Sequence, residues 1–412
     1  MPSVIEIATV ESPLPTVKKP GLNGVLAASA VNGSNRTTSL TVEDVKPPVE
    51  HYHNYWWTRC APLLATLLDN SGSYTPEQKS KHLRIFRDVV IPTLGPPPER
   101  AKVTPMLTID GSPVEPSWNF QDDSNIVRYS FEPLWDNAGT PENPFPGDLM
   151  PTLTPLLRYV SDDADLRWFN QVWDAWNVTG QEAQDAKANL PPHKSRIPLV
   201  FFAFDLKGGK CSLKAYVFPI LKHLATGLST KQLVFDQIRS LQPYGDAFAV
   251  PAAKLERFMD TYARGCTAEM IAVDCIDPSK ARFKVYGRVK SNSKSVIREV
   301  MTLGGAQTDE ISLKGVEQAL KIWHLLLDER NGLADDQAKA PRDPQHQHIG
   351  ICFVFELRPW EERIDVKAHT PWCQTNKSDL HAVANFTEAL STLGWDDHAS
   401  RFARGAVQAA TL

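Results

Sequence analysis

The sequence lacks a strong charge of either sign: over 412 residues the formal net charge is −4. A nearly neutral balance argues against nucleic acid or an anionic membrane as the main partner, because both favour basic surfaces. No apolar run approaches 18 residues and no secretory signal opens the chain, so we expect no membrane-spanning segment. The six cysteines show no CxxC spacing, which favours reduced thiols and a cytoplasmic location over a zinc site or a disulfide framework.

The sequence also lacks the short motifs of the common nucleotide-binding, metal-dependent and ester-hydrolysing enzymes. The P-loop, GxGxxG, HExxH and GxSxG patterns are all absent. Metal-dependent isoprenoid enzymes hold diphosphate through Mg²⁺ on DDxxD-type clusters, and the closest acidic runs here lack that spacing: 122-DD-123, 162-DDAD-165 and 335-DD-336. We interpret these runs as helix caps and solvated loops, and we predict no metal site.

What the sequence does contain is a recurring order of two helices followed by two strands. Residues 1–45 are poor in aromatics and have no sustained periodicity, so we predict a disordered arm there and a single domain over 46–412. The strand-like runs occur in pairs that follow helical segments. The pairs are 113–120 with 126–134, 198–206 with 211–219, 268–275 with 281–289, and 349–357 with 364–372.

The second run of each pair carries a basic residue with a tyrosine or histidine beside it. These motifs are Arg128-Tyr129, Lys214-Ala-Tyr216, Lys284-Val-Tyr286 and Lys367-Ala-His369, and their basic residues are 86, 70 and 83 positions apart. A motif that returns at this period marks an internal repeat. Consecutive antiparallel hairpins with helices outside predict an α+β barrel of repeated ααββ units around a central lumen.

The stretch 281-ARFKVYGRV-289 indicates what such a lumen would contain. Its charged and phenolic side chains occupy every second position, at Arg282, Lys284, Tyr286 and Arg288. One such motif alone is more often a solvated strand face. The repeated set, with helices expected over the apolar faces, favours a cationic lumen. Several cations and phenols in a water-poor cavity are suited to binding diphosphate.

Glu115 is the carboxylate in the largely apolar stretch 113-PVEPSWNF-120. One interpretation is a residue at the rim of the barrel that pairs with a lumen cation. The other is an acceptor for a substrate N–H or O–H, where a carboxylate raises the nucleophilicity of an aromatic ring. The pattern leaves both open.

Several motifs, in order, resemble the fungal aromatic (indole) prenyltransferases of the dimethylallyltryptophan synthase family. They are GSPVEPSWNFQ, VRYSFEPL, FDLKGGKCSLKAYVFP, ARFKVYG, TLGG with ALKIWHLLL, and DVKAHTPW, and the resemblance runs from about residue 52 to 410. It implies the ABBA prenyltransferase barrel of five ααββ units. It also implies transfer of a prenyl group, usually dimethylallyl from its diphosphate, to an aromatic acceptor in secondary-metabolite (alkaloid) biosynthesis, with no cofactor and no Mg²⁺ required for the chemistry.

The resemblance assigns roles position by position. Glu115 corresponds to the glutamate that accepts the indole N–H. The residues that correspond to the diphosphate-binding set are Arg128, Lys214, Arg282, Lys284 and Lys367. Tyr216 and Tyr286 correspond to tyrosines that bridge the diphosphate and shield the allyl cation, and His369 stands where the family usually has a further tyrosine. Cations would stabilise the departing diphosphate, and aromatic faces the allyl cation.

Two departures from the family pattern bear on the acceptor. His369 alters one wall of the cation shield. In members that prenylate C4 of tryptophan, the resemblance implies a lysine that handles the proton. The matching position here lies near Phe201, and the stretch 197–206 contains no lysine. We therefore expect a different acceptor or position, such as a tryptophan-containing cyclic dipeptide or another indole.

A third departure concerns barrel closure. The repeat and the family both predict a last strand pair after the helices expected within 378–410, so the barrel is expected to be C-terminally incomplete. An open edge would expose unpaired backbone groups, and we expect either a truncated chain or closure by another segment.

The leading hypothesis is an aromatic prenyltransferase that uses dimethylallyl diphosphate and an indole. The alternative is a non-catalytic or truncated relative that binds an aromatic ligand or a partner. A phosphatase-like α+β enzyme is weaker, because no metal cluster or nucleophile motif is present. The oligomeric state is left open, with a homodimer as one option.

Overall fold

The computed structural model describes residues 4–7, 51–121, 124–134, 145, 148–161, 163–191, 197–346 and 348–410. The helices are α1 (His51–Ser71), α2 (Pro76–Ile85), α3 (Met150–Val160), α4 (Arg167–Trp176), α5 (Gly180–Ala188), α6 (Ile220–Thr226), α7 (Thr230–Ser240), α8 (Ala249–Thr261), α9 (Lys294–Met301), α10 (Glu310–Leu326), α11 (Trp372–Thr375), α12 (Asp379–Thr392) and α13 (Asp396–Ala410). The strands are β1 (Val4–Ile7), β2 (Val114–Phe120), β3 (Asn125–Phe131), β4 (Val200–Lys207), β5 (Lys210–Val217), β6 (Thr267–Asp274), β7 (Phe283–Val289), β8 (Ile351–Leu357) and β9 (Asp365–Pro371).

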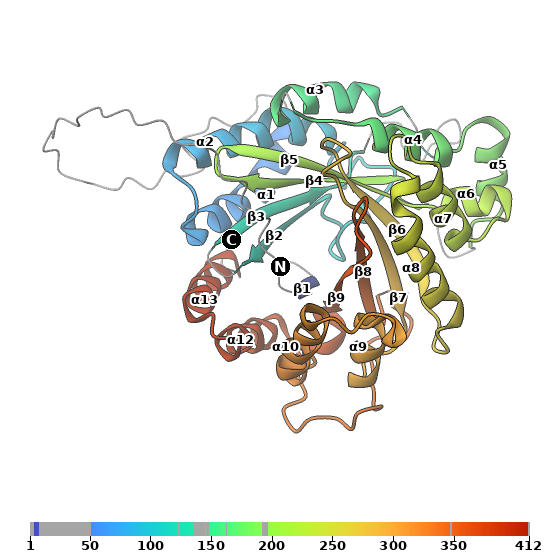
Figure 1. The fold of residues 1–412 in the computed structure, drawn as a ribbon. Helices are drawn as coiled ribbons and strands as arrows, with labels where there is room; N and C mark the ends of the chain where they lie inside the picture. Colours follow the sequence, from blue (N-terminus) through green and yellow to red (C-terminus); the bar gives the residue numbers. More distant parts are fainter. Residues whose placement is uncertain are drawn as a thin grey trace, which may run out of the picture.

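These strands form one antiparallel sheet in the order β1-β9-β8-β7-β6-β5-β4-β3-β2. The four hairpins predicted from the sequence are confirmed, and each follows helices in the chain. Figure 1 shows the sheet curving around a central space with the helices on its outer side. The described helices shown in this view therefore cover the outer face of the sheet.

The two faces of the sheet belong to separate clusters of buried side chains. The outer face joins the large core under the helices, with residues such as Phe204, Val285 and Phe355. The inner face holds a smaller cluster: Phe201, Ala203, Tyr216, Ala272, Tyr286, Cys352 and Val354. Because side chains alternate along a strand, the apolar face of 281–289 packs on helices and its cationic face lines the lumen.

Tyr129 differs from the corresponding residues of the other three repeats, Tyr216, Tyr286 and His369. It follows Arg128 directly, so its side chain points to the opposite face of β3. The ring lies in the outer core, with its centroid 5.2 Å from that of Phe86 and 5.7 Å from that of Phe204. Of the pair Arg128-Tyr129, only Arg128 therefore faces the lumen.

The fifth hairpin expected from the repeat is not among the described strands. Instead, β1 pairs with β9 at one end of the sheet, and C-terminal helices pack beside β2 at the other. The disordered arm expected over 1–45 contains a strand at Val4–Ile7, which pairs with β9. This pairing covers backbone groups that β9 would otherwise leave unpaired at the edge of the sheet. The rest of the expected arm lies outside the described residues.

At the other end, the helices expected within 378–410 are confirmed as α12 and α13, and they pack beside β2. The Phe120 ring contacts Phe386 and Phe402 at centroid distances of 6.0 and 6.1 Å. His398 Nε2 lies 2.7 Å from the carbonyl oxygen of Gln121, just after β2. An aromatic cluster therefore fixes the C-terminal helices to the first strand of the hairpin series.

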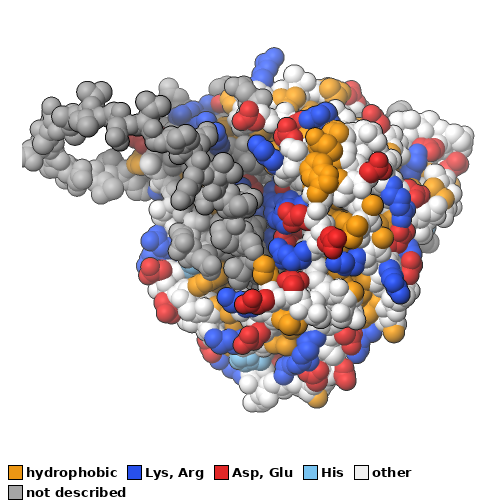
Figure 2. All heavy atoms as spheres, viewed as in Figure 1, with side chains coloured by type: hydrophobic (Ala, Val, Ile, Leu, Met, Phe, Trp, Pro, Cys, Tyr) orange, Lys and Arg blue, Asp and Glu red, His pale blue; other side chains and the backbone are white. Residues whose placement is uncertain are grey.

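The described surface shows charges of both signs. On the face drawn in Figure 2, basic and acidic side chains are interspersed among other residues. Among the described helices, none combines the length and apolar character needed to cross a bilayer.

Candidate active site

The lumen-facing side chains fall into three levels, because each strand contributes every second residue. The first level, nearest the hairpin tips, is charged: Arg128, Asp205, Lys214, Asp274, Lys284, Glu356 and Lys367, with Arg282 at the start of β7. The second level is aromatic or small: Ser130, Ala203, Tyr216, Ala272, Tyr286, Val354 and His369. The third contains Phe201, Phe218, Met270, Cys352 and Arg288. Between hairpins the register follows the grouping, since Lys284, Tyr286 and Arg288 lie opposite Glu356, Val354 and Cys352. Within these hairpins the register is offset by one level: Lys214, Lys284 and Lys367 lie opposite Ala203, Ala272 and Val354.

Charges alternate around the first level from strand to strand. The cations lie on β3, β5, β7 and β9, and Arg282 directly precedes β7. The carboxylates lie on β4, β6 and β8. Asp205 joins the first two cations: its Oδ1 is 2.5 Å from Arg128 Nε and its Oδ2 is 2.5 Å from Lys214 Nζ. Sequence analysis missed these carboxylates.

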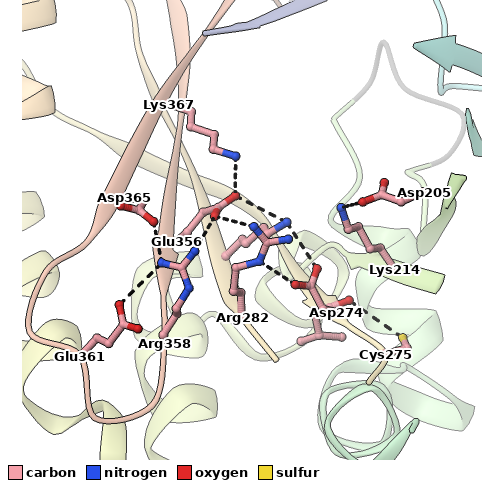
Figure 3. Close-up of polar contacts among 12 residues, drawn as sticks. Asp205, Lys214, Asp274, Cys275, Arg282, Glu356, Arg358, Glu361, Asp365 and Lys367 are labelled. Carbon is pink, nitrogen blue, oxygen red and sulfur yellow. Dashed lines mark hydrogen bonds and ion pairs between the residues drawn. The ribbon is translucent and has the colours of Figure 1, made fainter. Parts of the chain in front are cut away.

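Asp274 and Glu356 join the remaining cations in the same way (Figure 3). Arg282 donates to both, with Nε 2.7 Å from Asp274 Oδ2 and Nη1 3.0 Å from Glu356 Oε2. Lys284 Nζ lies 3.4 Å from Asp274 and 3.6 Å from Glu356, and Lys367 Nζ lies 3.0 Å from Glu356. Glu356 therefore pairs with Arg282, Lys284 and Lys367, and it also lies 3.9 Å from Arg358 of its own chain segment.

Five cations and three carboxylates leave these eight residues with an excess of two positive charges. The charges are largely removed from water: Glu356 is 1% exposed, Lys214 3% and Lys284 5%. Charge-assisted hydrogen bonds strengthen where water is excluded. The first level is therefore suited to binding an anion that carries two or more charges.

The electrostatics of the first level depend on burial and on these pairs. Burial would raise the pKa values of Asp205 and Glu356, but the adjacent cations outweigh it and hold both well below the usual range. Lys214 shows the opposite balance: burial, followed by the charge of Arg128, lowers its pKa to about 7, against the attraction of Asp205. Lys214 is thus the cation whose charge is most easily lost near neutral pH.

The second level brings Tyr216, Tyr286 and His369 together as an aromatic wall. The ring centroids of Tyr216 and Tyr286 are 6.0 Å apart, and those of Tyr286 and His369 are 5.9 Å apart with nearly perpendicular planes. Ala203 and Ala272 belong to the same buried cluster. Aromatic faces of this kind stabilise a cation and exclude water.

Glu115 reaches the lumen face from β2. It lies opposite Ser130, two residues further from the hairpin tip than Arg128, while its neighbour Val114 belongs to the outer core. By alternation, the Glu115 side chain therefore lies on the lumen face, opposite Ser130. A contact between Glu115 and a substrate ring stays a prediction.

The acidic runs without DDxxD spacing have structural roles where the structure describes them. Asp165 accepts the backbone N–H of Arg167 at the start of α4, and Asp335 pairs with Arg298 at the surface. The run at 122–123 lies outside the described residues. Across the described residues, His, Cys, Asp and Glu side chains form no group of three that could hold a metal ion.

Comparison with known proteins gives a consistent result. The family model described as tryptophan dimethylallyltransferase matches residues 52–404. The indole diterpene prenyltransferase terF of Tolypocladium album is 34% identical over 83% of this chain and 82% of its own length. The indole prenyltransferase tdiB of Emericella nidulans is 33% identical over 82% of this chain and 84% of its own. The crystal structure of AnaPT from Neosartorya fischeri superposes with a TM-score of 0.73 at 26% identity, covering 86% of this chain and 85% of that one.

Glu356→Gln tests the shared ion-pair network. Removing the carboxylate that serves three buried cations should lower the free energy of unfolding by about 3–5 kcal/mol. Inorganic diphosphate should stabilise this variant more than the wild type, because the anion replaces the missing negative charge. Urea unfolding with and without diphosphate measures both effects.

The matched control is Glu388→Gln, which removes the partner of Arg330 in an exposed pair whose side chains are 56% (Arg330) and 48% (Glu388) exposed. Exposed pairs contribute little, so this variant should unfold as the wild type does. An equal diphosphate response in wild type and Glu356→Gln would contradict the shared network.

The lowered pKa of Lys214 predicts that binding of an alkyl diphosphate is coupled to proton uptake. Because its pKa is lowered to about 7, Lys214 is mainly neutral at pH 8, and a bound anion favours its charged form. Affinity should therefore fall as pH rises above 7, by up to about tenfold per pH unit. Calorimetry in buffers of different ionisation enthalpy measures the protons taken up between pH 8 and 9, above the range near pH 6 in which phosphate esters titrate.

Lys214→Arg provides the comparison, since a guanidinium stays protonated throughout this range. Its binding should take up fewer protons and vary less with pH. Proton uptake that is identical in the two proteins would show that another group titrates.

Proposed function

The chain belongs to the tryptophan dimethylallyltransferase family, and on that basis we propose that it transfers a dimethylallyl group from its diphosphate to the aromatic ring of an indole acceptor. One observation carries the proposal: a level of buried cations with excess positive charge lies directly beside a level of aromatic side chains. Ionising an allylic diphosphate requires both, one for the departing anion and one for the carbocation.

The reaction follows the order of the levels. The C–O bond of the donor breaks, and its electron pair leaves with the diphosphate, which the Arg and Lys side chains of the first level stabilise. The allyl cation lies between the rings of Tyr216, Tyr286 and His369, where water is excluded. The indole ring attacks the cation to form a C–C bond, and loss of the ring proton to solvent or to the diphosphate restores aromaticity.

The basic side chains of the first level also support a reaction that does not require a metal ion. Phosphoryl and diphosphate groups need positive charge on their oxygens when the leaving group departs. The first level supplies five basic side chains: Lys284 on β7, Lys367 on β9, Arg282 just before β7, Arg128 on β3 and Lys214 on β5. We propose that these cations provide the neutralisation that Mg²⁺ provides in other isoprenoid enzymes.

Glu115 is proposed to accept the indole N–H. Glu115 lies on the lumen face of β2, and in this proposal an indole ring beside the aromatic wall faces the allyl cation and donates its N–H to the carboxylate. Withdrawing the N–H proton toward a carboxylate raises electron density on the ring carbons. Orientation of the acceptor and its activation would then come from the same contact.

The cellular setting is proposed from the thiols. All six cysteines are free in the structure, and burial is the main cause that raises the thiol pKa of each. Inert, reduced thiols suit the cytoplasm, where disulfides are rare.

The direct test incubates the protein with dimethylallyl diphosphate and a panel of indoles in the presence of EDTA. Mass spectrometry should find a product heavier than the acceptor by about 68 Da, one C5H8 unit, as simple group transfer requires. A folded protein that yields no product across the panel would favour the non-catalytic alternative.

Glu115→Ala tests the role of the carboxylate. We expect kcat to fall by roughly 10²–10⁴-fold, the range for a positioned acid–base group, with little change in unfolding temperature. Glu317→Ala, at an exposed position of α10, is the matched control and should retain activity. Turnover by Glu115→Ala close to that of the wild type would remove Glu115 from the mechanism.

A further inference from the structure

Arg288 is a lumen cation that the proposed transfer step does not use. It lies on β7 four residues beyond Lys284, which places it about 13 Å further along the strand at a rise of about 3.3 Å per residue. Tyr286 separates the two. Along β7 the order is therefore a cation for the diphosphate, a ring for the allyl cation, and a second cation beyond the reacting carbon.

Arg288 lies on the lumen face of β7, opposite Thr267 of β6 and Cys352 of β8. Arg288 itself is 8% exposed. A guanidinium in such a setting needs a specific partner, because burying an isolated charge is costly.

A β-bulge supplies that partner. The pairing of β6 with β7 shifts between Ala268 and Met270, so Glu269 is the extra residue. Ala268 belongs to the outer core and Met270 packs against the lumen cluster. Bulges turn side chains away from the regular alternation, and here Glu269 Oε1 lies 2.6 Å from Arg288 Nε.

The pair keeps capacity for a ligand. Among the described residues, the terminal amino groups of Arg288 make only long contacts: Nη1 lies 3.4 Å from the carbonyl oxygen of Ile349, and Nη2 lies 3.4 Å from His348 Nδ1. Good N–H···O bonds are 2.7–3.2 Å long. The side chain of Glu269 is 36% exposed, so its carboxylate is also accessible. Together the two side chains offer donors and acceptors with no net charge.

We propose that Arg288 and Glu269 bind the part of the acceptor that lies away from the prenylated ring, and that this part is an uncharged group bearing carbonyl or hydroxyl oxygen. The inference rests on the proposed function and specifies its acceptor. A carbonyl oxygen can accept from Arg288, and a hydroxyl can also donate to Glu269. An acceptor with a free carboxylate would bring its negative charge close to Glu269 when it binds Arg288. This contact between like charges disfavours binding of such an acceptor.

Three indoles with matched rings test the proposal, each with dimethylallyl diphosphate: N-acetyltryptophanamide, N-acetyltryptophan and 3-methylindole. The first two share an N-acetyl amide and differ only in a primary carboxamide against a carboxylate, and the third has none of these groups. The wild type should favour the amide over the acid by at least about tenfold in kcat/KM, the effect of roughly one hydrogen bond to a charged group.

Two variants should change this selectivity in different ways. Glu269→Gln should reduce the preference for the amide over the acid by about tenfold or more, because Arg288 then has no competing carboxylate. Arg288→Gln should lower the ratio of kcat/KM for the amide to that for 3-methylindole by about 10–100-fold. Arg288→Lys keeps the charge without the planar fork and should give an intermediate ratio.

Folding and donor binding are followed separately. Thermal unfolding checks each variant, with Arg330→Gln in the exposed pair with Glu388 as the control. Calorimetry with a non-ionising dimethylallyl diphosphate analogue should give dissociation constants within about threefold of the wild type, because the pair is remote from the first level.

The outcomes separate the two claims. If the wild type prenylates at least one indole and the selectivity ratios are the same in the variants, the inference is wrong and the proposed function stands. Equal loss on all three indoles, or weaker binding of the donor analogue, likewise overturns it. If the wild type transfers to none of the three, the proposed function fails, and the inference fails with it.

Discussion

Burying five like charges in one cavity is the constraint on which the rest of the structure depends. Cations on β3, β5, β7 and β9 can share a water-poor lumen only because carboxylates on β4, β6 and β8 lie between them. Each carboxylate accepts from at least two cations, so no charge is left unpaired within this set of eight residues. The antiparallel register, which places a cation opposite a carboxylate on neighbouring strands, is therefore as important as the residues themselves.

The excess of two positive charges and the two-residue period of a strand together explain how the site can work. The same strand presents a charge, then a ring, then a third side chain, as β7 does with Lys284, Tyr286 and Arg288. Anion binding, cation shielding and acceptor recognition are thus separated in space without separate domains. The helices make this possible because they cover the apolar outer faces and leave the inner faces free for polar residues.

The sequence predicted the hairpins, the helices and the lumen cations because their signals are local and repeated. It did not predict Asp205, Asp274 and Glu356, since each ends or interrupts an apolar run, as in VFFAFDL, and its role appears only when strand register is known. The Arg128-Tyr129 motif was misleading as a repeat of the lumen motif. Tyr129 follows its basic residue by one position instead of two, so its side chain points to the outer face of the sheet. The pairing of Val4–Ile7 with β9 and the bulge at Glu269 depend on tertiary contacts that no sequence motif marks.

The most direct test of the central claim is a crystal structure with a non-ionising dimethylallyl diphosphate analogue. We predict diphosphate oxygens within about 3.2 Å of the side-chain nitrogens of Lys214, Lys284 and Lys367. The prenyl chain should lie between the rings of Tyr216 and Tyr286, with His369 beside it. Diphosphate bound outside the first level, or a prenyl chain directed away from this aromatic wall, would contradict the layered site.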